Sequence, residues 1–221
     1  MNHLTHLYLA DPTPDCRLGA LMGDYVKGPL ENRYPPEIRW GLKQHRLLDR
    51  FAESNAWFRR SKQRLCPTFR HCRGIMVDVV YDHFLARNWP DYSSMPLETF
   101  AGSIYLLLEE RRPILPPALQ KAAPRLVAAD WLVACRNTEP LDGILRRLGA
   151  RLSRPTLLDE GFAELLRNYQ GLEQDFTGFM TDAADFMNGL RREQTGPDPK
   201  RLTGRSGAAF SGERLLQRRL L

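Results

Sequence analysis

Apolar side chains recur at helical spacing along most of the chain. A nearly continuous apolar run extends from Ile75 to Leu85, and the segment after Thr156 carries leucine, aromatic and methionine side chains three and four residues apart. This spacing puts apolar side chains on one face of an α-helix. No segment shows the alternation of apolar and polar residues that is typical of a half-buried strand, so the pattern predicts an all-α fold.

Capping residues and prolines mark where the predicted helices begin. Serine, threonine, asparagine or aspartate at the N-cap, and proline in the first turn, fit the geometry of a helix start. The prolines of segment 113–124 predict a rigid connector instead. Helices are expected through 75–88 and 128–135, and after the capping or initiating residues Asn2, Asp15, Pro35, Ser54, Pro96, Thr138 and Thr156.

The pattern divides the chain into one domain and a tail. Residues 1–195 keep the helical spacing and hold enough apolar side chains for one sizeable core. Residues 196–221 are rich in glycine, proline, serine and arginine, with six basic residues against two acidic ones. Such a composition buries little apolar surface, so we expect a basic, flexible tail without a catalytic role.

The cysteines and the lengths of the apolar segments predict a cytoplasmic protein. The four cysteines show neither CxxC nor zinc-finger spacing, so they are interpreted as free thiols in a reducing compartment. The N-terminal segment has no basic leader, and no apolar stretch is long enough to span a bilayer. We therefore expect no membrane partner.

Two pairs of polar residues interrupt the apolar segments at a spacing of four. Asp78 and Asp82 form one pair, and His45 and Asp49 form the other. Residues four apart lie on the same helix face, and two carboxylates among apolar neighbours repel each other unless a cation joins them. An exposed acidic stripe is the alternative for the first pair alone. Two such pairs favour facing walls of one polar pocket in a helical bundle.

A divalent metal ion would satisfy such a pocket. His83 adds an imidazole beside Asp82, and mixed oxygen and nitrogen ligands suit Mn, Fe, Zn or Mg. A metal held in this way lowers the pKa of a bound water and draws charge from phosphoryl oxygens, which favours hydrolysis of phosphate esters and diesters. The chain has no glycine-rich phosphate loop and no GxSxG motif that would indicate another chemistry.

Two further polar residues occupy unusual positions. Asp24 lies near the C-terminal end of the second predicted helix, where the helix dipole disfavours an acid, so it needs a metal or an arginine as partner. His6 lies among leucines in the first predicted helix. Taken alone, it is interpreted as a hydrogen-bonded core histidine rather than a ligand.

Basic residues are concentrated in two parts of the chain. The net charge is +6, and segment 39–73 holds ten lysines and arginines against Asp49 and Glu53. This asymmetry predicts a positive face suited to an acidic protein, a phosphate or a nucleic acid, although a solvated helix face is the alternative. Arginine forms paired hydrogen bonds with phosphate oxygens, and the predicted substrate-binding residues are Arg39, Lys43, Arg46 and Arg50.

Four separated motifs carry a resemblance to a known family. They are MNHLTHLYLA at 1–10, LMGDYVKG at 21–28, HRLLD at 45–49 and DVVYDHFLARNW at 78–89. In this order they resemble the bacterial acyl carrier protein phosphodiesterases, over residues 1–195. That family is similar to the HD-domain metal-dependent phosphohydrolases, so the resemblance implies an HD-domain-like bundle of helices.

The resemblance implies an activity and roles for individual residues. The expected reaction removes 4'-phosphopantetheine from the serine of holo-acyl carrier protein, with Mn²⁺ as the working ion and Mg²⁺, Fe²⁺ or Co²⁺ as alternatives. The acidic carrier would dock on the basic segment, with no nucleic acid as partner. His6, Asp49 and His83 match family positions as catalytic residues, either orienting ligands or donating protons, while the ligand candidates are Asp24, His45, Asp78 and Asp82.

Two other functions fit the same residues. A nucleotide or alarmone phosphohydrolase of the HD type would use similar ligands, and would act on small nucleotides without any carrier protein. A non-enzymatic helical adaptor for acidic proteins or RNA would need no metal. Substitution of Asp78 or His45 would leave the binding of such an adaptor intact.

Overall fold

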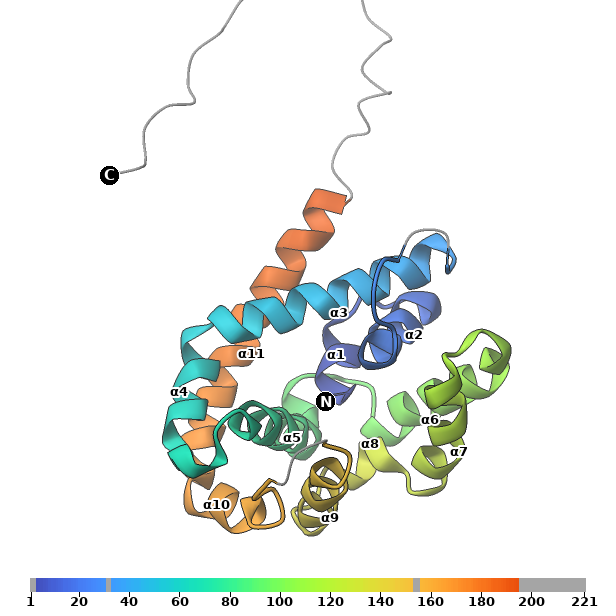
Figure 1. The fold of residues 1–221 in the computed structure, drawn as a ribbon. Helices are drawn as coiled ribbons and strands as arrows, with labels where there is room; N and C mark the ends of the chain where they lie inside the picture. The colour runs from blue at the N-terminus through green and yellow to red at the C-terminus, as the bar shows by residue number, and fades with distance from the viewer. Residues whose placement is uncertain (1–2, 31–32, 153–155, 195–221) are drawn as a thin grey trace, which may run out of the picture.

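The computed structural model describes residues 3–30, 33–152 and 156–194. In these ranges the chain forms α-helices joined by loops and short 3₁₀ turns, without a β-strand (Figure 1). This confirms the predicted all-α fold. The expected tail over 196–221 and the Asn2 cap lie outside the described residues. The α-helices are α1 (His3–Leu9), α2 (Pro14–Met22), α3 (Pro36–Ser54), α4 (Ala56–Arg64), α5 (Cys72–Arg87), α6 (Leu97–Glu110), α7 (Pro117–Ala128), α8 (Trp131–Ala134), α9 (Glu139–Gly149), α10 (Gly161–Arg167) and α11 (Tyr169–Gln194).

Helix α5 is the central element of the core. Helices α1, α4, α9 and α11 all contact it, and most of its side chains are buried, including Met76, Val80 and Phe84. A helix that is apolar on every side belongs in a protein interior, which explains the continuous apolar run in this segment. Asp78 and Asp82 therefore project from a buried helix, where a carboxylate needs partners.

Helices α2 and α3 approach each other backbone to backbone. A Cβ atom at Gly19 would lie 2.2 Å from a backbone oxygen of α3, and one at Gly41 would lie 2.0 Å from a backbone oxygen of α2. Any side chain at either position would push the helices apart. This close crossing fixes Asp24, which lies in the 3₁₀ turn that follows α2, relative to His45 on α3.

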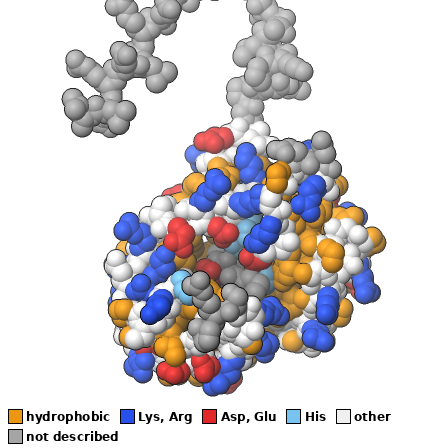
Figure 2. Space-filling view, viewed as in Figure 1, with side chains coloured by type: hydrophobic (Ala, Val, Ile, Leu, Met, Phe, Trp, Pro, Cys, Tyr) orange, Lys and Arg blue, Asp and Glu red, His pale blue; other side chains and the backbone are white. Residues whose placement is uncertain are grey.

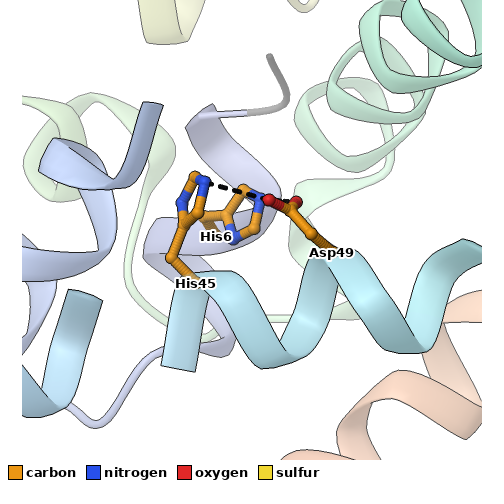
Figure 3. A group of neighbouring side chains, drawn as sticks. All are labelled: His6, His45 and Asp49. Atoms are coloured by element: carbon orange, nitrogen blue, oxygen red, sulfur yellow. Dashed lines mark ion pairs between the residues drawn. The ribbon is translucent and has the colours of Figure 1, made fainter. Parts of the chain in front are cut away.

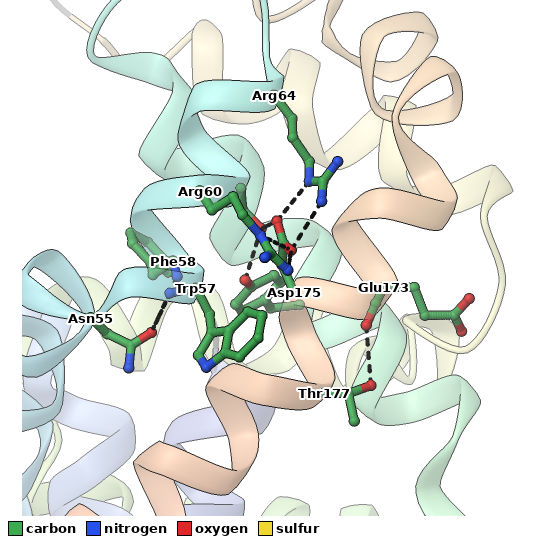
Figure 4. Close-up of polar contacts among 10 residues, drawn as sticks. Asn55, Trp57, Phe58, Arg60, Arg64, Glu173, Asp175 and Thr177 are labelled. Atoms are coloured by element: carbon green, nitrogen blue, oxygen red, sulfur yellow. Dashed lines mark hydrogen bonds and ion pairs between the residues drawn. The ribbon is translucent and has the colours of Figure 1, made fainter.

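A buried carboxylate fastens α4 to the long helix α11 (Figure 4). Asp175 of α11 is fully buried, and it accepts hydrogen bonds from Arg60 Nε at 2.6 Å, Arg64 Nε at 2.7 Å and Ser61 Oγ at 3.1 Å. Burial alone would raise the pKa of Asp175, but hydrogen bonds from Arg64 and Arg60 outweigh it and lower that pKa. Asp175 is thus held as an ion that joins the two helices.

Two of the predicted helix caps are wrong because a neighbouring residue takes their place, and a third, Thr156, is wrong because the next helix begins at Gly161 after the N-cap Glu160. Thr13, rather than Asp15, caps α2, and its Oγ1 accepts a hydrogen bond at 3.3 Å from a backbone N–H of the first turn. Asn55, rather than Ser54, caps α4, and its Oδ1 accepts two backbone N–H groups at 2.9 and 3.2 Å. All four residue types suit an N-cap, so only the extended backbone at Thr13 and Asn55 decides between neighbours.

Two predictions about longer segments are also wrong. The proline-rich segment 113–124 is not a connector, because Pro116 and Pro117 occupy the N-cap and the first turn of α7, where a missing N–H costs little. The long helix expected after Thr156 is two helices, α10 and α11, which separate at Asn168. None of the helices in the described ranges is both long and apolar enough to cross a lipid bilayer.

Candidate functional site

Three predicted site residues meet between α1 and α3 (Figure 3). The Nε2 atom of His6 lies 3.2 Å from Asp49 Oδ1, and the Nε2 atom of His45 lies 3.3 Å from Asp49 Oδ2. The two imidazole rings stack with centroids 3.7 Å apart. One ligand atom from each of the three residues lies within 4.8 Å of the other two, which is close enough for them to share one metal ion.

Asp24 and His3 extend this cluster on one side. Asp24 Oδ1 lies 3.9 Å from His45 Nε2, and its Oδ2 lies 4.0 Å from His3 Nδ1. The side chain of Asp24 is 30% exposed, yet its Oδ2 is buried and has no hydrogen-bond partner in the described part of the chain. A buried carboxylate oxygen without a donor is costly, which indicates a cation at this point.

The tautomer of His45 directs a hydrogen-bond acceptor at the carboxylates of the cluster. His45 Nδ1 lies 2.8 Å from the Ala20 carbonyl oxygen, which accepts hydrogen bonds and cannot donate them. Nδ1 therefore carries a proton, and Nε2 presents a lone pair when no second proton is bound. That lone pair faces the carboxylates of Asp49 and Asp24. Three acceptors directed at one another are held together by a metal ion or by an added proton.

Glycine at position 23 gives His45 the space for this orientation. A Cβ atom at Gly23 would lie 2.1 Å from Cγ of the His45 ring and 2.5 Å from its Nδ1. The ring therefore lies directly against the backbone of the turn that carries Asp24. Gly23 occupies a helical conformation that any residue can adopt, so its role here is to leave room for the imidazole.

Asp78 completes an acidic cavity beside the cluster. The cavity has a volume of about 270 Å³, and its walls include Asp24, Asp49, Glu53 and Asp78. Burial raises the pKa of Asp78, and the negative charges of Asp49 and Asp24 raise it further. Carboxylates that repel one another around one small space form a typical setting for a divalent cation.

Two of the histidines are neutral at physiological pH. Burial lowers the pKa of His6 to about 4, with a further contribution from His45, and burial lowers the pKa of His3 to about 4. A neutral imidazole keeps a lone pair on one ring nitrogen, as a metal ligand must. A histidine that loses its proton this readily is a poor proton donor at neutral pH, so the chemistry of His6 suits a ligand better than an acid.

The donor set therefore fits a divalent metal ion. The structure brings three predicted residues, Asp24, Asp49 and Asp78, to one cavity, with His6 and His45 in direct contact with Asp49. They come from α1, the turn after α2, α3 and α5. Oxygen and imidazole ligands from several helices are what such an ion needs, and the oxygen-rich set suits Mn²⁺ or Mg²⁺.

Asp82, a predicted ligand, has other partners. Its Oδ2 accepts the Leu4 N–H at 3.0 Å, and its Oδ1 accepts the N–H of Thr5 at 2.9 Å and the hydroxyl of Thr5 at 2.8 Å. These N–H groups begin α1 and have no acceptor within that helix. Burial raises the pKa of Asp82 to about 7, against the hydrogen bonds from Thr5 and Leu4 that lower it. In these positions both oxygens of Asp82 hold α1 in place.

His83, a predicted catalytic residue, has hydrogen-bond partners outside the cluster. It is 1% exposed, and its Nδ1 lies 2.8 Å from the Cys135 carbonyl oxygen. Its Nε2 lies 2.6 Å from the hydroxyl of Tyr169 on α11. Both ring nitrogens thus connect α5 to neighbouring segments. Burial lowers the pKa of His83, so the ring is predominantly neutral at physiological pH.

The four predicted substrate-binding residues all lie on α3. Arg46 Nη2 donates to the carbonyl oxygens of Val26 at 3.0 Å and Gly28 at 2.9 Å, which holds the loop after Asp24. The other three residues have exposed or half-buried side chains on this helix: Arg50 directly follows Asp49, Lys43 lies over Trp40, and Arg39 is one turn earlier. Of these, Arg50 is nearest in sequence to the cluster.

Three residues around the cluster were missed by the sequence analysis. His3 contacts Asp24 from α1, while Glu53 and His71 line the acidic cavity. The three-residue step between His3 and His6 on one helix was the available signal for His3. Glu53 lies four residues after Asp49, so the spacing that identified His45 also pointed to it. No local pattern marks His71, which follows a 3₁₀ turn between α4 and α5.

Comparison with known proteins gives a consistent result. A family model described as acyl carrier protein phosphodiesterase matches residues 1–183. Proteins named acyl carrier protein phosphodiesterase from Salmonella paratyphi A, Salmonella newport and Salmonella heidelberg are each 30% identical over 187 residues, covering 81% of this chain and 93% of the relative. No solved structure matches the chain. The motifs, the cluster and this similarity over most of its length place the chain in the acyl carrier protein phosphodiesterase family.

Proposed function

We propose that the protein hydrolyses the phosphodiester of holo-acyl carrier protein, releasing 4'-phosphopantetheine and the apo-carrier, with a divalent metal ion at the His6, His45 and Asp49 cluster. One observation carries this proposal. The Nε2 atom of His45 lies 3.3 Å from Asp49 Oδ2 and 3.9 Å from Asp24 Oδ1, and both carboxylates line an acidic cavity. Such a set of acceptors supports a metal-assisted hydrolysis rather than a passive binding surface.

The ligand set follows from the contacts of each residue. We assign His6, His45, Asp24, Asp49 and Asp78 to holding the ion, which we propose is Mn²⁺, with Mg²⁺, Fe²⁺ or Co²⁺ as alternatives. A metal ion in this position would draw charge from the phosphoryl oxygens and lower the pKa of water beside them. The Ala20 carbonyl fixes the tautomer of His45.

The remaining predicted residues receive structural roles in this proposal. Asp82 orders α1, and thereby His3 and His6, through its hydrogen bonds to the first turn. His83 connects α5 to Tyr169 and is assigned to positioning the helices rather than to proton transfer. Arg46 holds the loop that follows Asp24. We therefore assign Arg50, which is exposed next to Asp49, to binding a phosphate oxygen.

The surface around the cavity supports an acidic protein as the substrate. Figure 2 shows acidic and histidine side chains near the centre of one face, with lysine and arginine side chains around them. Lys62 pairs with Glu53 on the cavity wall, Arg73 is next to wall residue Gly74, and Arg70 is exposed close by in sequence. Basic groups around an acidic centre would guide an acidic carrier while leaving the centre to the metal ion.

Mass spectrometry of the carrier tests the proposal. Purified protein is incubated with holo-carrier and Mn²⁺, and we expect the apo-carrier and free 4'-phosphopantetheine to accumulate. A chelator should stop the reaction, and the His45→Ala variant should leave the carrier intact. An unchanged carrier in the presence of each of the four divalent ions would refute the activity. Hydrolysis of small nucleotides in its place would favour the HD-type nucleotide or alarmone phosphohydrolase.

A further inference from the structure

A second cavity, with apolar walls, adjoins the cluster. It has a volume of about 300 Å³ and lies among α5, α7, α8 and α9. The side chains that give it its apolar character include Leu126, Trp131, Ile144 and Leu148. These residues are half-buried, so the cavity is open to solvent on one side. Its volume is at the lower end of the roughly 300–1,000 Å³ that is typical of small-molecule sites.

His3 forms the boundary between this apolar cavity and the metal cluster. Its Nδ1 lies 4.0 Å from Asp24 Oδ2, while its ring also lines the apolar cavity. The ring stacks on Tyr25, with centroids 6.2 Å apart, and meets the edge of Trp131, with centroids 6.0 Å apart. A molecule bound at the cluster therefore needs to extend only past one imidazole to enter the apolar cavity.

The polar groups of the apolar cavity select an uncharged chain. Asp82 contributes the carboxylate in its wall, so a second phosphate placed deep in the cavity would be repelled. Arg147 and Arg151, exposed residues that also line the cavity, place positive charge at its edge.

We propose that the apolar cavity binds the pantetheine arm of the substrate, while the phosphate that anchors this arm lies at the metal cluster. The inference rests on the proposed function, which places a phosphodiester at that cluster. The arm is a neutral linear chain with two amide groups and apolar segments between them. Its length beyond the phosphate lies along His3 and Trp131 and packs against the apolar walls of the cavity.

Filling the apolar cavity tests the proposal on the full chain. Ala122 of α7 lines the cavity and is half-buried, whereas Ala118 of the same helix is exposed and does not line it. We expect Ala122→Phe to lower kcat/KM for holo-carrier by roughly tenfold or more, with Ala118→Phe close to the wild type. Leu148→Trp, from α9, fills the same space from the opposite side and serves as the second variant.

An arm-free substrate separates the two proposals. Bis(4-nitrophenyl) phosphate is a small diester that needs the metal cluster but no arm cavity, so its hydrolysis should be equal in the wild type and in both filling variants. Free pantetheine should inhibit the cleavage of holo-carrier by the wild type without inhibiting that of the small diester. Retention of the wild-type melting temperature shows that a variant is folded.

Each result has a distinct meaning. Loss of carrier cleavage in both filling variants, with the small diester unaffected, supports the arm site. Unchanged cleavage of holo-carrier in the folded variants, or no inhibition by pantetheine, overturns the arm site and leaves the proposed function standing. Failure of the wild type to cleave holo-carrier overturns the proposed function itself. Coenzyme A carries the same arm, and its hydrolysis in place of the carrier would overturn the assignment to a protein substrate.

Discussion

The imidazole rings of His6 and His45 stack 3.7 Å apart at an angle of 17°, although they come from the first helix and from α3. Both rings direct Nε2 at the same carboxylate, that of Asp49. Two histidines in such contact cannot both be charged without strong repulsion, so neutral rings beside a separate metal ion, as we propose, suit this geometry.

Replacement of His45 by alanine should weaken metal binding strongly with the fold retained. His45→Ala removes the lone pair that faces Asp49 and Asp24, and we expect the Mn²⁺ affinity to fall about 10- to 100-fold or more. Carrier cleavage should be lost with it. Calorimetric titration with Mn²⁺ measures the affinity. The control is His83→Gln, which should bind Mn²⁺ as the wild type does, whereas equal losses in both variants would contradict the assigned ligand set.

A methyl group at position 23 should displace the imidazole ring of His45. The Cβ atom of Gly23→Ala would lie 2.1 Å from the His45 ring, so the ring must move and its hydrogen bond to the Ala20 carbonyl should weaken. We expect weaker Mn²⁺ binding and a lower melting temperature. Gly102→Ala, in α6, is the matched control, because nothing lies within 4 Å of its Cβ position.

The control variant is informative because its melting temperature should change in the opposite direction. Alanine in a helix interior is about 0.5–1 kcal/mol more favourable than glycine, so Gly102→Ala should raise the melting temperature slightly. A stable Gly23→Ala protein with wild-type Mn²⁺ affinity would show that the close contact does not orient His45.

The sequence predicted the helical fold and much of the site because both depend on short-range spacing. His45 and Asp49 lie on one face of α3 because they are four residues apart. The apolar run 75–85 likewise indicated the buried helix α5. The helix starts at Thr13 and Asn55 were missed, since neighbouring residues of equal capping ability compete and only the surrounding fold decides between them.

Long-range contacts explain what the sequence did not predict. Asp78 and Asp82 have the same local pattern, yet Asp78 lines the acidic cavity and Asp82 accepts hydrogen bonds from Leu4 and Thr5. No local pattern can tell which carboxylate meets the start of another helix. The apolar cavity has a similar origin, because it is formed by α7, α8 and α9, and α7 was expected to be a connector.

Because Asp82 holds α1 and does not line the acidic cavity, Asp82→Asn should change the stability of the protein more than its metal binding. Asparagine keeps one acceptor oxygen and puts an amide donor in place of the other, so the variant should lose a hydrogen bond to the first turn of α1 but still bind Mn²⁺. The pKa of Asp82 is raised to about 7 by burial, so ionisation costs stability as pH rises from about 4 to 7. The stability of the variant relative to the wild type should therefore increase over that window. Loss of Mn²⁺ binding in a folded variant would instead identify Asp82 as a ligand.

Salt should weaken carrier cleavage but not the cleavage of a small diester. The basic residues near the cavity, Arg50, Arg70 and Arg73, attract an acidic partner over distances that salt screens, with a Debye length of about 10 Å at 0.1 M. We expect KM for holo-carrier to rise with ionic strength while kcat changes little. Charge reversal by Arg70→Glu should raise KM at low salt, and Arg125→Glu, exposed on α7, is the control. A KM that is independent of salt would contradict electrostatic docking.

The ion pair between α4 and α11 should make stability depend on acid pH. Hydrogen bonds from Arg64 and Arg60 outweigh burial and lower the pKa of Asp175, so its contribution is present at neutral pH and is lost as pH falls below the unfolded value of about 4. Asp175→Asn should lower the free energy of unfolding by about 1–3 kcal/mol at pH 7, since the two arginines are partly exposed and screened by solvent. The difference from the wild type should shrink in urea unfolding at acid pH, because protonation removes the charge of Asp175 in both states. A constant difference from pH 7 to pH 3 would show that Asp175 acts through packing and neutral hydrogen bonds instead.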